Sequence, residues 1–223
     1  MSSTSLLIIE LVISYIAMII IYKKYKTEGM YIYTIVALIL SFIMSLKTIS
    51  FYNYDVNLGI IPFVTVFTSF NIVMQKKGNE ETKKLLMTVL ATTLISYIIL
   101  LLVSYMDSSN INLFTNASYD NIFNDSIRLY FANIVTLLYS ILLNNKLYYY
   151  LKLMKNNILI SNIFSTIIIQ FVASILFGLI GYVFTLEVID IIKIIMIRYL
   201  ISIIVGVLST VVIYITKYIK EEK

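Results

Sequence analysis

The stretch Val188–Thr216 reads VIDIIKIIMIRYLISIIVGVLSTVVIYIT and contains only three charged residues. It is longer than the roughly 20 apolar residues that a helix needs to cross a hydrocarbon core about 30 Å thick. Six earlier stretches share this character: Leu6–Tyr22, Met30–Leu46, Leu58–Met74, Leu85–Met106, Ile127–Leu143 and Ile158–Phe184. Their apolar runs are continuous and lack a period of two, which favours helices over the strands of a membrane barrel.

The composition of the whole chain agrees with this pattern. Of its 223 residues, 60% are hydrophobic and 13% are charged, and the mean hydropathy is +0.93. Soluble domains carry about 25% charged residues, so this chain lacks the charge to cover a surface in water. We therefore predict an all-α membrane protein, a polytopic bundle of about seven transmembrane helices. Because no connection is long enough to fold by itself, residues 1–223 are expected to form a single transmembrane domain.

The basic residues predict the orientation of this bundle. Thirteen of the 17 fall in alternate connections and in the C-terminal tail: Lys23, Lys24, Lys26, Lys76, Lys77, Lys83, Lys84, Lys146, Lys152, Lys155, Lys217, Lys220 and Lys223. The residues before Leu6 and the connections at 107–126 and 185–187 contain no Lys or Arg. The positive-inside rule then places the N-terminus outside and the C-terminus in the cytoplasm of a multi-pass protein of the cell (plasma) membrane.

Several classes of function are disfavoured by what the chain lacks. It has no Cys and no His, so it offers no thiol nucleophile, no imidazole base and none of the usual zinc ligands. We expect no enzymatic activity, no cofactor and no metal site. Nucleic acid is not an expected partner, because the basic residues lie beside apolar spans and are better explained by the lipid bilayer.

Two arginines fall outside the cytoplasmic set and within or beside apolar spans. Arg198 lies about ten residues into the last span, and Arg128 begins the fifth. Asp190 and Arg198 are spaced i, i+8, so they share a helix face and could form an ion pair that reaches the outer surface. The alternative is an electropositive pocket, open to the outside, to which Arg128 contributes from another helix. A charge at mid-span costs about 2.5–3.5 kcal/mol on insertion scales, so such groups mark candidate solute sites.

A polar stripe runs along the sixth span. Asn162, Thr166, Gln170 and Ala173 follow a spacing of three to four, which places them on one helix face. In lipid this face must turn inward, because an unsatisfied amide costs several kcal/mol there. Hydrogen bonding between helices and contact with a solute both explain the stripe. The small residues Ser202 and Gly206 indicate close helix packing.

Four segments of the chain resemble one transporter family, in order and in spacing. They are Gly29–Thr48 (GMYIYTIVALILSFIMSLKT), Asn57–Gly78 (NLGIIPFVTVFTSFNIVMQKKG), Asn162–Gln170 (NIFSTIIIQ) and Ser209–Tyr214 (STVVIY). Together they cover about residues 29–215 and are similar to the putative vitamin uptake transporter (VUT) family. The resemblance implies an integral membrane transporter, because characterised members take up queuosine precursors, the 7-deazaguanines.

The chain also departs from the family pattern. Neutral residues stand where the resemblance implies acidic ones: Asn71, Gln75, Asn144, Ala173 and Ser209. Ser202 stands in place of a basic residue, and Arg198 lies one turn before it. A carboxylate accepts two N–H donors from a guanine-like edge, whereas an amide accepts with one oxygen and must also donate. Either the ligand differs from that of the family, or transport has been lost.

The leading hypothesis is uptake of a small polar solute, most directly a queuosine precursor or a related compound. The substrate-binding residues that we predict are Asn71, Gln75, Arg128, Asn162, Thr166, Gln170 and Arg198. Two alternatives remain open: a substrate-binding subunit of a multi-component transporter, and a degenerate, non-transporting membrane interaction protein. The chain contains no Gly-x-x-x-x-Gly-Lys loop to bind a nucleotide, so partners could include an energising module or further copies of the chain.

Overall fold

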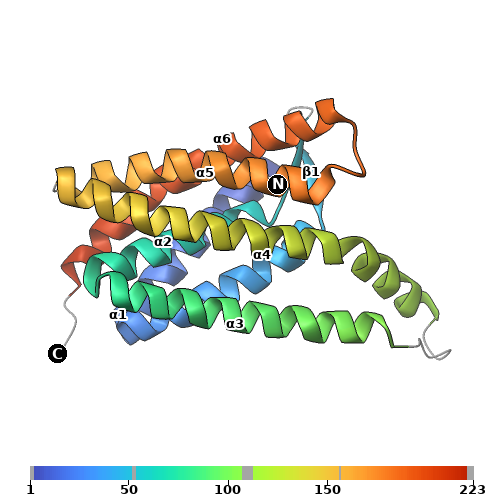
Figure 1. The fold of residues 1–223 in the computed structure, drawn as a ribbon, viewed down its shortest axis with the longest axis horizontal. Helices are drawn as coiled ribbons and strands as arrows, with labels where there is room; N and C mark the ends of the chain where they lie inside the picture. The colour runs from blue at the N-terminus through green and yellow to red at the C-terminus, as the bar shows by residue number, and fades with distance from the viewer. Residues whose placement is uncertain (1–2, 52–53, 107–112, 156, 220–223) are drawn as a thin grey trace.

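The computed structural model describes residues 3–51, 54–106, 113–155 and 157–219. Within these ranges the elements are α1 (Ser3–Ser45), β1 (Thr48–Phe51), β2 (Tyr54–Asn57), α2 (Ile60–Lys76), α3 (Asn79–Ser104), α4 (Leu113–Lys155), α5 (Ile158–Tyr182) and α6 (Val188–Tyr218). Five of the helices are long and apolar enough to cross a membrane. The prediction of a helical membrane bundle is confirmed at this level (Figure 1).

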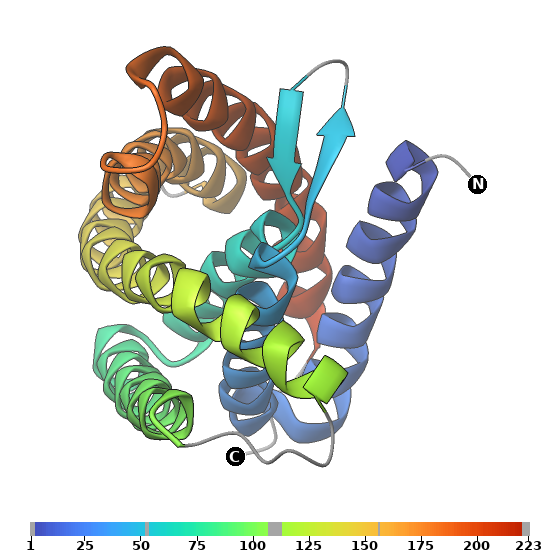
Figure 2. The ribbon, with the colours of Figure 1, turned by 90° about the vertical axis from the view of Figure 1, so that its right-hand side faces the viewer.

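The first helix contains two of the predicted spans. Lys26 has a φ of 53° and a ψ of −135°, which interrupts α1 between its two halves. Figure 2 shows the halves diverging from this bend. α2 is shorter, at 17 residues. The count of seven crossings and the orientation of the termini stay predictions.

Two connections differ from what the sequence predicted. Much of the segment 107–126, expected to be a loop, is helical, because α4 begins at Leu113 and continues to Lys155; residues 107–112 lie outside the described residues. The apolar run Ile127–Leu143 therefore marked only the middle of a helix whose ends are polar. The connection after α1 forms an antiparallel hairpin in which Thr48 pairs with Asn57 and Phe51 with Tyr54.

α2 forms the centre of the bundle. Each residue from Ile60 to Met74 is buried, and α2 packs against α1, α3, α4 and α6. The hairpin returns to α1 through Gly59, where an added Cβ would lie 2.1 Å from Ser45 Oγ and 2.2 Å from the Ser41 carbonyl oxygen. Only glycine fits this contact, so α2 starts directly against the end of α1.

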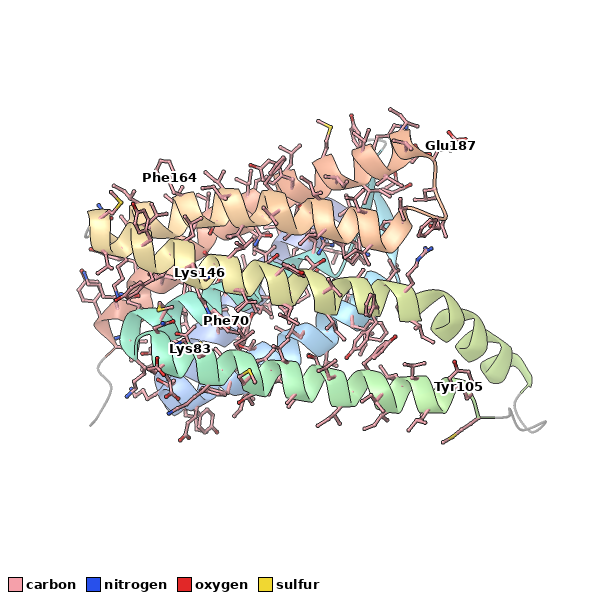
Figure 3. The ribbon with its side chains drawn as sticks, in the orientation of Figure 1. Phe70, Lys83, Tyr105, Lys146, Phe164 and Glu187 are labelled. Carbon is pink, nitrogen blue, oxygen red and sulfur yellow. The ribbon has the colours of Figure 1, made fainter. Side chains whose placement is uncertain are left out.

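The two ends of the bundle differ in charge. The bend at Lys26, the turn between α2 and α3 and the end of α6 lie at one end, where Figure 3 labels Lys83 and Lys146. We call this the basic end. The hairpin and the turn between α5 and α6 lie at the other, the hairpin end, near which Glu187 and Tyr105 are labelled. The alternate connections that the lysines singled out are thus brought to one side of the molecule.

Candidate functional site

Three buried asparagines from three helices bind one another towards the basic end. Asn144 Nδ2 of α4 donates to Asn71 Oδ1 of α2 at 2.7 Å, and Asn71 Nδ2 donates to Asn162 Oδ1 of α5 at 2.8 Å. Asn162 Nδ2 donates in turn to Thr210 Oγ1 of α6 at 2.8 Å and to Ser209 Oγ at 3.2 Å. We call these five residues the asparagine network. Its amides use one another as partners, so the network links four helices without any ligand.

A second set of buried polar side chains lies nearer the hairpin end and has no such partners. Ser140, Thr136 and Asn133 precede Asn144 by 4, 8 and 11 residues on the same face of α4. Gln170 and Ser174 lie one turn apart on α5, and Arg198 lies on α6. We call these six residues the polar column. Ser140 Oγ, Thr136 Oγ1, both Asn133 amide atoms, Gln170 Nε2, Ser174 Oγ and both Arg198 Nη atoms find no hydrogen-bond partner among the described residues.

This contrast indicates which part of the interior can bind a solute. A buried donor or acceptor without a partner costs about 1–3 kcal/mol. Groups that are already paired must break bonds before they accept a ligand, whereas the polar column gains bonds when water or a solute enters. The column therefore has the larger unused capacity for hydrogen bonds.

Arg198 is the charged member of the column. Its side chain is only 4% exposed, and its guanidinium carbon lies 3.8 Å from the Phe177 ring centre and 5.1 Å from that of Phe63. The hollow beside it has a volume of about 10 Å³ and is bounded by residues 55–57 of β2. This volume suffices for about one water molecule. The hairpin thus covers the guanidinium, and the open outward pocket expected from the sequence is not formed in this conformation.

The ion pair between Asp190 and Arg198, the other alternative raised by the sequence, is also not formed. Asp190 Oδ1 instead accepts from Lys193 Nζ at 2.8 Å, on the exposed side of α6. The structure contradicts the alternative of an outward-reaching pair, because Arg198 is buried in the bundle. The aromatic faces of Phe177 and Phe63 replace the missing carboxylate as its neighbours.

Arg128 lies at the rim of the bundle. It is half-buried, and its Nη2 donates to Thr185 Oγ1 in the turn between α5 and α6 at 2.8 Å. The Tyr182 side chain lies within electrostatic range of both Arg128 and Arg198. Arg198 is buried and Arg128 is half-buried, and their joint contribution to a solute pocket stays a prediction.

The remaining predicted residues lie inside the bundle. The stripe of Asn162, Thr166, Gln170 and Ala173 is buried, as predicted. Thr166 forms the contact with α6, since a Cβ at Gly206 would lie 2.1 Å from its Cγ2 atom. Gln75 is half-buried one turn beyond Asn71, and its Oε1 atom has no partner among the described residues.

The surroundings of these residues could not be predicted from the sequence. Phe63 and Phe177, which enclose Arg198, carry no sequence signal that separates them from other core aromatics. Ser174 has a signal, because it lies one turn after Gln170 on the stripe face. Asn144 was noted only as a departure from a family pattern, and its bond to Asn71 needed the fold.

The comparison with family models decides the relationship. The model described as "Putative vitamin uptake transporter" matches residues 57–216, which is more than half of the chain. The chain belongs to this family. The family assignment made from the sequence is confirmed, although the match begins at residue 57 and leaves out α1. Comparisons with curated proteins and with solved structures found no match. Together with the apolar helices, membership of this family shows that the protein is a membrane protein of a transporter family.

Three of the departures from the VUT pattern meet in one place. Asn71, Asn144 and Ser209 stand where the resemblance implied acidic residues, and all three belong to the asparagine network. Carboxylates at these positions would repel one another around Asn162. Amides and a hydroxyl both donate and accept, so together they close a set of bonds that carboxylates could not.

Proposed function

We propose that the protein is an uptake carrier for a small, flat, polar solute in the plasma membrane, with a queuosine precursor of the 7-deazaguanine type as the first candidate. We further propose that the whole chain acts as one domain with seven crossings. The polar column is the observation that supports this proposal. It places unpaired donors and acceptors of α4, α5 and α6 in the interior of a transporter-family bundle, with the guanidinium of Arg198 against two aromatic rings.

The column offers complementary contacts to such a solute. The ring faces of Phe177 and Phe63 contact the Arg198 guanidinium, and a flat heterocycle that displaces the guanidinium can stack on them. The Nη groups of Arg198 and the Nε2 group of Gln170 can donate to a ring carbonyl oxygen. The hydroxyl oxygens of Thr136, Ser140 and Ser174 can accept from exocyclic N–H groups.

Passage through the bundle requires two barriers to open in turn. On one side, β2 covers Arg198. On the other, the bonds from Asn71 to Asn144 and Asn162 hold α2, α4 and α5 together. A solute that moves from the column to the basic end must displace these bonds and supply its own donors and acceptors in their place.

Complementation tests the proposed substrate. A bacterial strain that cannot make queuosine precursors is supplied with external precursor and the gene for this protein. Restored queuosine in tRNA and uptake of labelled precursor are the expected results. Normal membrane expression without either result would exclude this substrate.

The proposed orientation has a separate test. Because the chain contains no cysteine, Lys146→Cys and Glu187→Cys each create a single thiol. We expect a membrane-impermeant maleimide to label Cys at 187 in intact cells and Cys at 146 only after permeabilisation. The reverse pattern would contradict the orientation.

A second candidate function is supported by the self-satisfied asparagine network. If the network serves only to fix the helices, the protein is a non-transporting relative that binds no purine-like solute. The double variant Asn71→Asp with Gln75→Glu distinguishes the cases. Binding of deazapurines gained only in this variant would indicate a carrier altered away from the family ligand.

The third candidate is a substrate-binding subunit. Co-purification with an ATPase would support it, and uptake by the purified chain alone in liposomes would exclude it.

A further inference from the structure

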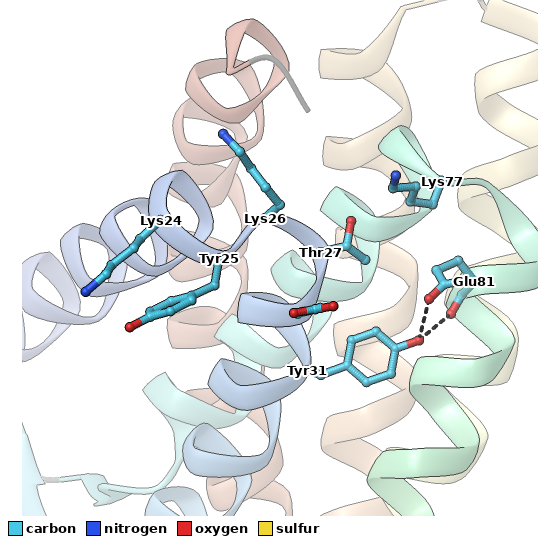
Figure 4. Close-up of a pocket in the computed structure, with 8 residues that line it drawn as sticks. Lys24, Tyr25, Lys26, Thr27, Tyr31, Lys77 and Glu81 are labelled. Atoms are coloured by element: carbon cyan, nitrogen blue, oxygen red, sulfur yellow. Dashed lines mark hydrogen bonds between the residues drawn. The ribbon is translucent and has the colours of Figure 1, made fainter. Parts of the chain in front are cut away.

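A large hollow lies at the basic end, away from the polar column. Its volume is about 550 Å³, and it is lined by Lys24, Tyr25, Lys26, Thr27, Glu28, Tyr31, Lys77 and Glu81. Figure 4 shows that these residues come from both sides of the bend in α1, from the end of α2 and from the first turn of α3. The site therefore forms where three helix ends meet.

The charges on its rim favour an anion. Of the two carboxylates, Glu81 already accepts from the Tyr31 hydroxyl at 2.9 Å and pairs with Lys84 at 3.2 Å. Among the described residues, neither Lys24 nor Lys26 forms an ion pair, and Lys24 lies 5.1 Å from the centre of the Tyr25 ring. Lys24 and Lys26 thus outnumber Glu28, the one carboxylate of the lining for which no ion pair is found in the described part of the chain.

The hollow continues into an apolar groove between two helices. A second hollow of about 610 Å³ shares Glu28, Tyr31 and Glu81 with the first and extends along Ile32 of α1 and Met87 of α3. The side chains of Ile32 and Met87 are 53% and 67% exposed, so in a bilayer they face acyl chains. The Tyr31–Glu81 bond crosses between α1 and α3 where the basic and apolar parts join.

The same two helices carry a further apolar groove nearer the hairpin end. It has a volume of about 430 Å³ and is lined mainly by Ile39 and Ile43 of α1, by Leu46 directly after α1, and by Ile99 and Leu100 of α3. From Tyr31 to Ile43 the helix rises about 18 Å at 1.5 Å per residue. This length is close to one leaflet, half of a hydrocarbon core about 30 Å thick.

We propose that this seam between α1 and α3 binds an anionic phospholipid. Its phosphate lies at the rim formed by Lys24, Lys26 and Lys77, and an acyl chain follows Ile32 and Met87. A free phosphate would use the lysines but not the apolar continuation. The bound lipid connects α3, much of whose apolar surface is exposed, to the bend of α1.

A tryptophan reporter tests this site, since the chain has no Trp of its own. Ile32→Trp places the reporter in the seam. Val211→Trp places a matched reporter on an exposed position of α6, a similar number of residues from that helix end. Each variant is reconstituted in phosphatidylcholine vesicles that contain a minor fraction of dibrominated phosphatidylglycerol or dibrominated phosphatidylcholine, and quenching is compared.

We expect brominated phosphatidylglycerol to quench the Ile32→Trp reporter more than brominated phosphatidylcholine does, and both lipids to quench the Val211→Trp reporter equally. Lys24→Gln with Lys26→Gln should weaken the phosphatidylglycerol preference about tenfold. The control pair Lys23→Gln with Lys146→Gln removes two exposed lysines of the same end that do not line the hollow, and should leave the preference intact.

Three outcomes would overturn the proposal. Equal quenching of the Ile32→Trp reporter by both lipids would show that no anionic headgroup is selected. A preference that survives Lys24→Gln with Lys26→Gln, in protein that elutes as a folded species, would place the headgroup elsewhere. Loss of the preference on adding millimolar inorganic phosphate would assign the lysines to a free anion. Each result is independent of solute uptake.

Discussion

Arg198 is a buried cation, and its burial has a large free-energy cost in this interior. Burying an ion without a partner costs several kcal/mol, and cation–π contacts with desolvated rings return about 2 kcal/mol each. Phe177 and Phe63 therefore offset only part of the cost. The part of the burial cost that these ring contacts do not offset favours a role for Arg198 in binding a solute.

Replacing Arg198 by Met separates these contributions. Arg198→Met keeps a long side chain between the rings and removes the buried charge, so we expect equal or greater thermal stability in detergent. Uptake of the transported solute should fall at least about tenfold, the effect of losing about 1.4 kcal/mol of binding. Lys193→Met, on the exposed side of the same helix, is the control. A strongly destabilised Arg198→Met protein would assign the arginine a structural role.

Asn71 has the opposite character, because both of its polar atoms are paired. Asn71→Ala leaves the Asn144 amide and the Asn162 carbonyl oxygen without partners, and we expect a loss of about 1–3 kcal/mol in the free energy of unfolding. Unfolding in mixed micelles measures this loss. Thr92→Ala, which removes a hydroxyl bonded only within its own helix, should change stability far less. Equal effects of the two variants would contradict the importance of the network.

At the scale of the elements, the sequence predicted the apolar runs well and the helix ends poorly. Hydropathy detects where lipid contacts a helix, and the seven runs correspond to helical segments within the described residues. It cannot detect that α4 continues through polar residues at both ends, since Asn, Asp and Ser are only weakly unfavourable in helices. The hairpin was missed because its register depends on contacts with α1 and α6.

The bend in α1 predicts that glycine substitutions at two nearby positions, Lys26 and Lys24, change the stability in opposite directions. Lys26 holds a positive φ of 53°, which costs a non-glycine residue about 1–3 kcal/mol. Lys26→Gly should therefore raise stability by about 1 kcal/mol. Lys24→Gly, within the helical half, should lower it by about 1 kcal/mol. Thermal unfolding of both variants in the same detergent measures the contrast, and destabilisation by Lys26→Gly would argue against this backbone conformation.

The contact between α5 and α6 depends on one methyl group. A Cβ at position 206 would lie 2.1 Å from Thr166 Cγ2 but 3.4 Å from its Cβ. Gly206→Ala should cost about 1–3 kcal/mol of stability through overpacking. Adding Thr166→Ser removes the Cγ2 atom and should restore most of the loss. If the double variant were no more stable than Gly206→Ala alone, the two helices would not meet at this point.

At the scale of the whole molecule, the sequence predicted that the candidate site lies in the interior. It could not predict which of the buried polar side chains bond to one another and which have no partner. The inward stripe of α5 followed from spacing and from the cost of exposing amides to lipid. Whether Asn162 and Gln170 are paired depends on side chains from α2 and α6, which spacing within one helix cannot reveal. The division between a paired network and an unpaired column became visible only with the fold.

The most direct measurement asks whether the polar column is reached by water and solute. Ser174→Cys introduces the only thiol of the chain at a buried hydroxyl without a partner. Ile168→Cys places a matched thiol on the exposed face of the same helix. We expect a small hydrophilic methanethiosulfonate reagent to modify the cysteine at 174 in membranes, and we expect the transported solute to slow this reaction while leaving the rate at position 168 unchanged. If the cysteine at 174 does not react with the reagent, and adding solute does not change this, then neither water nor solute reaches the column. The column would then be a dry packing layer.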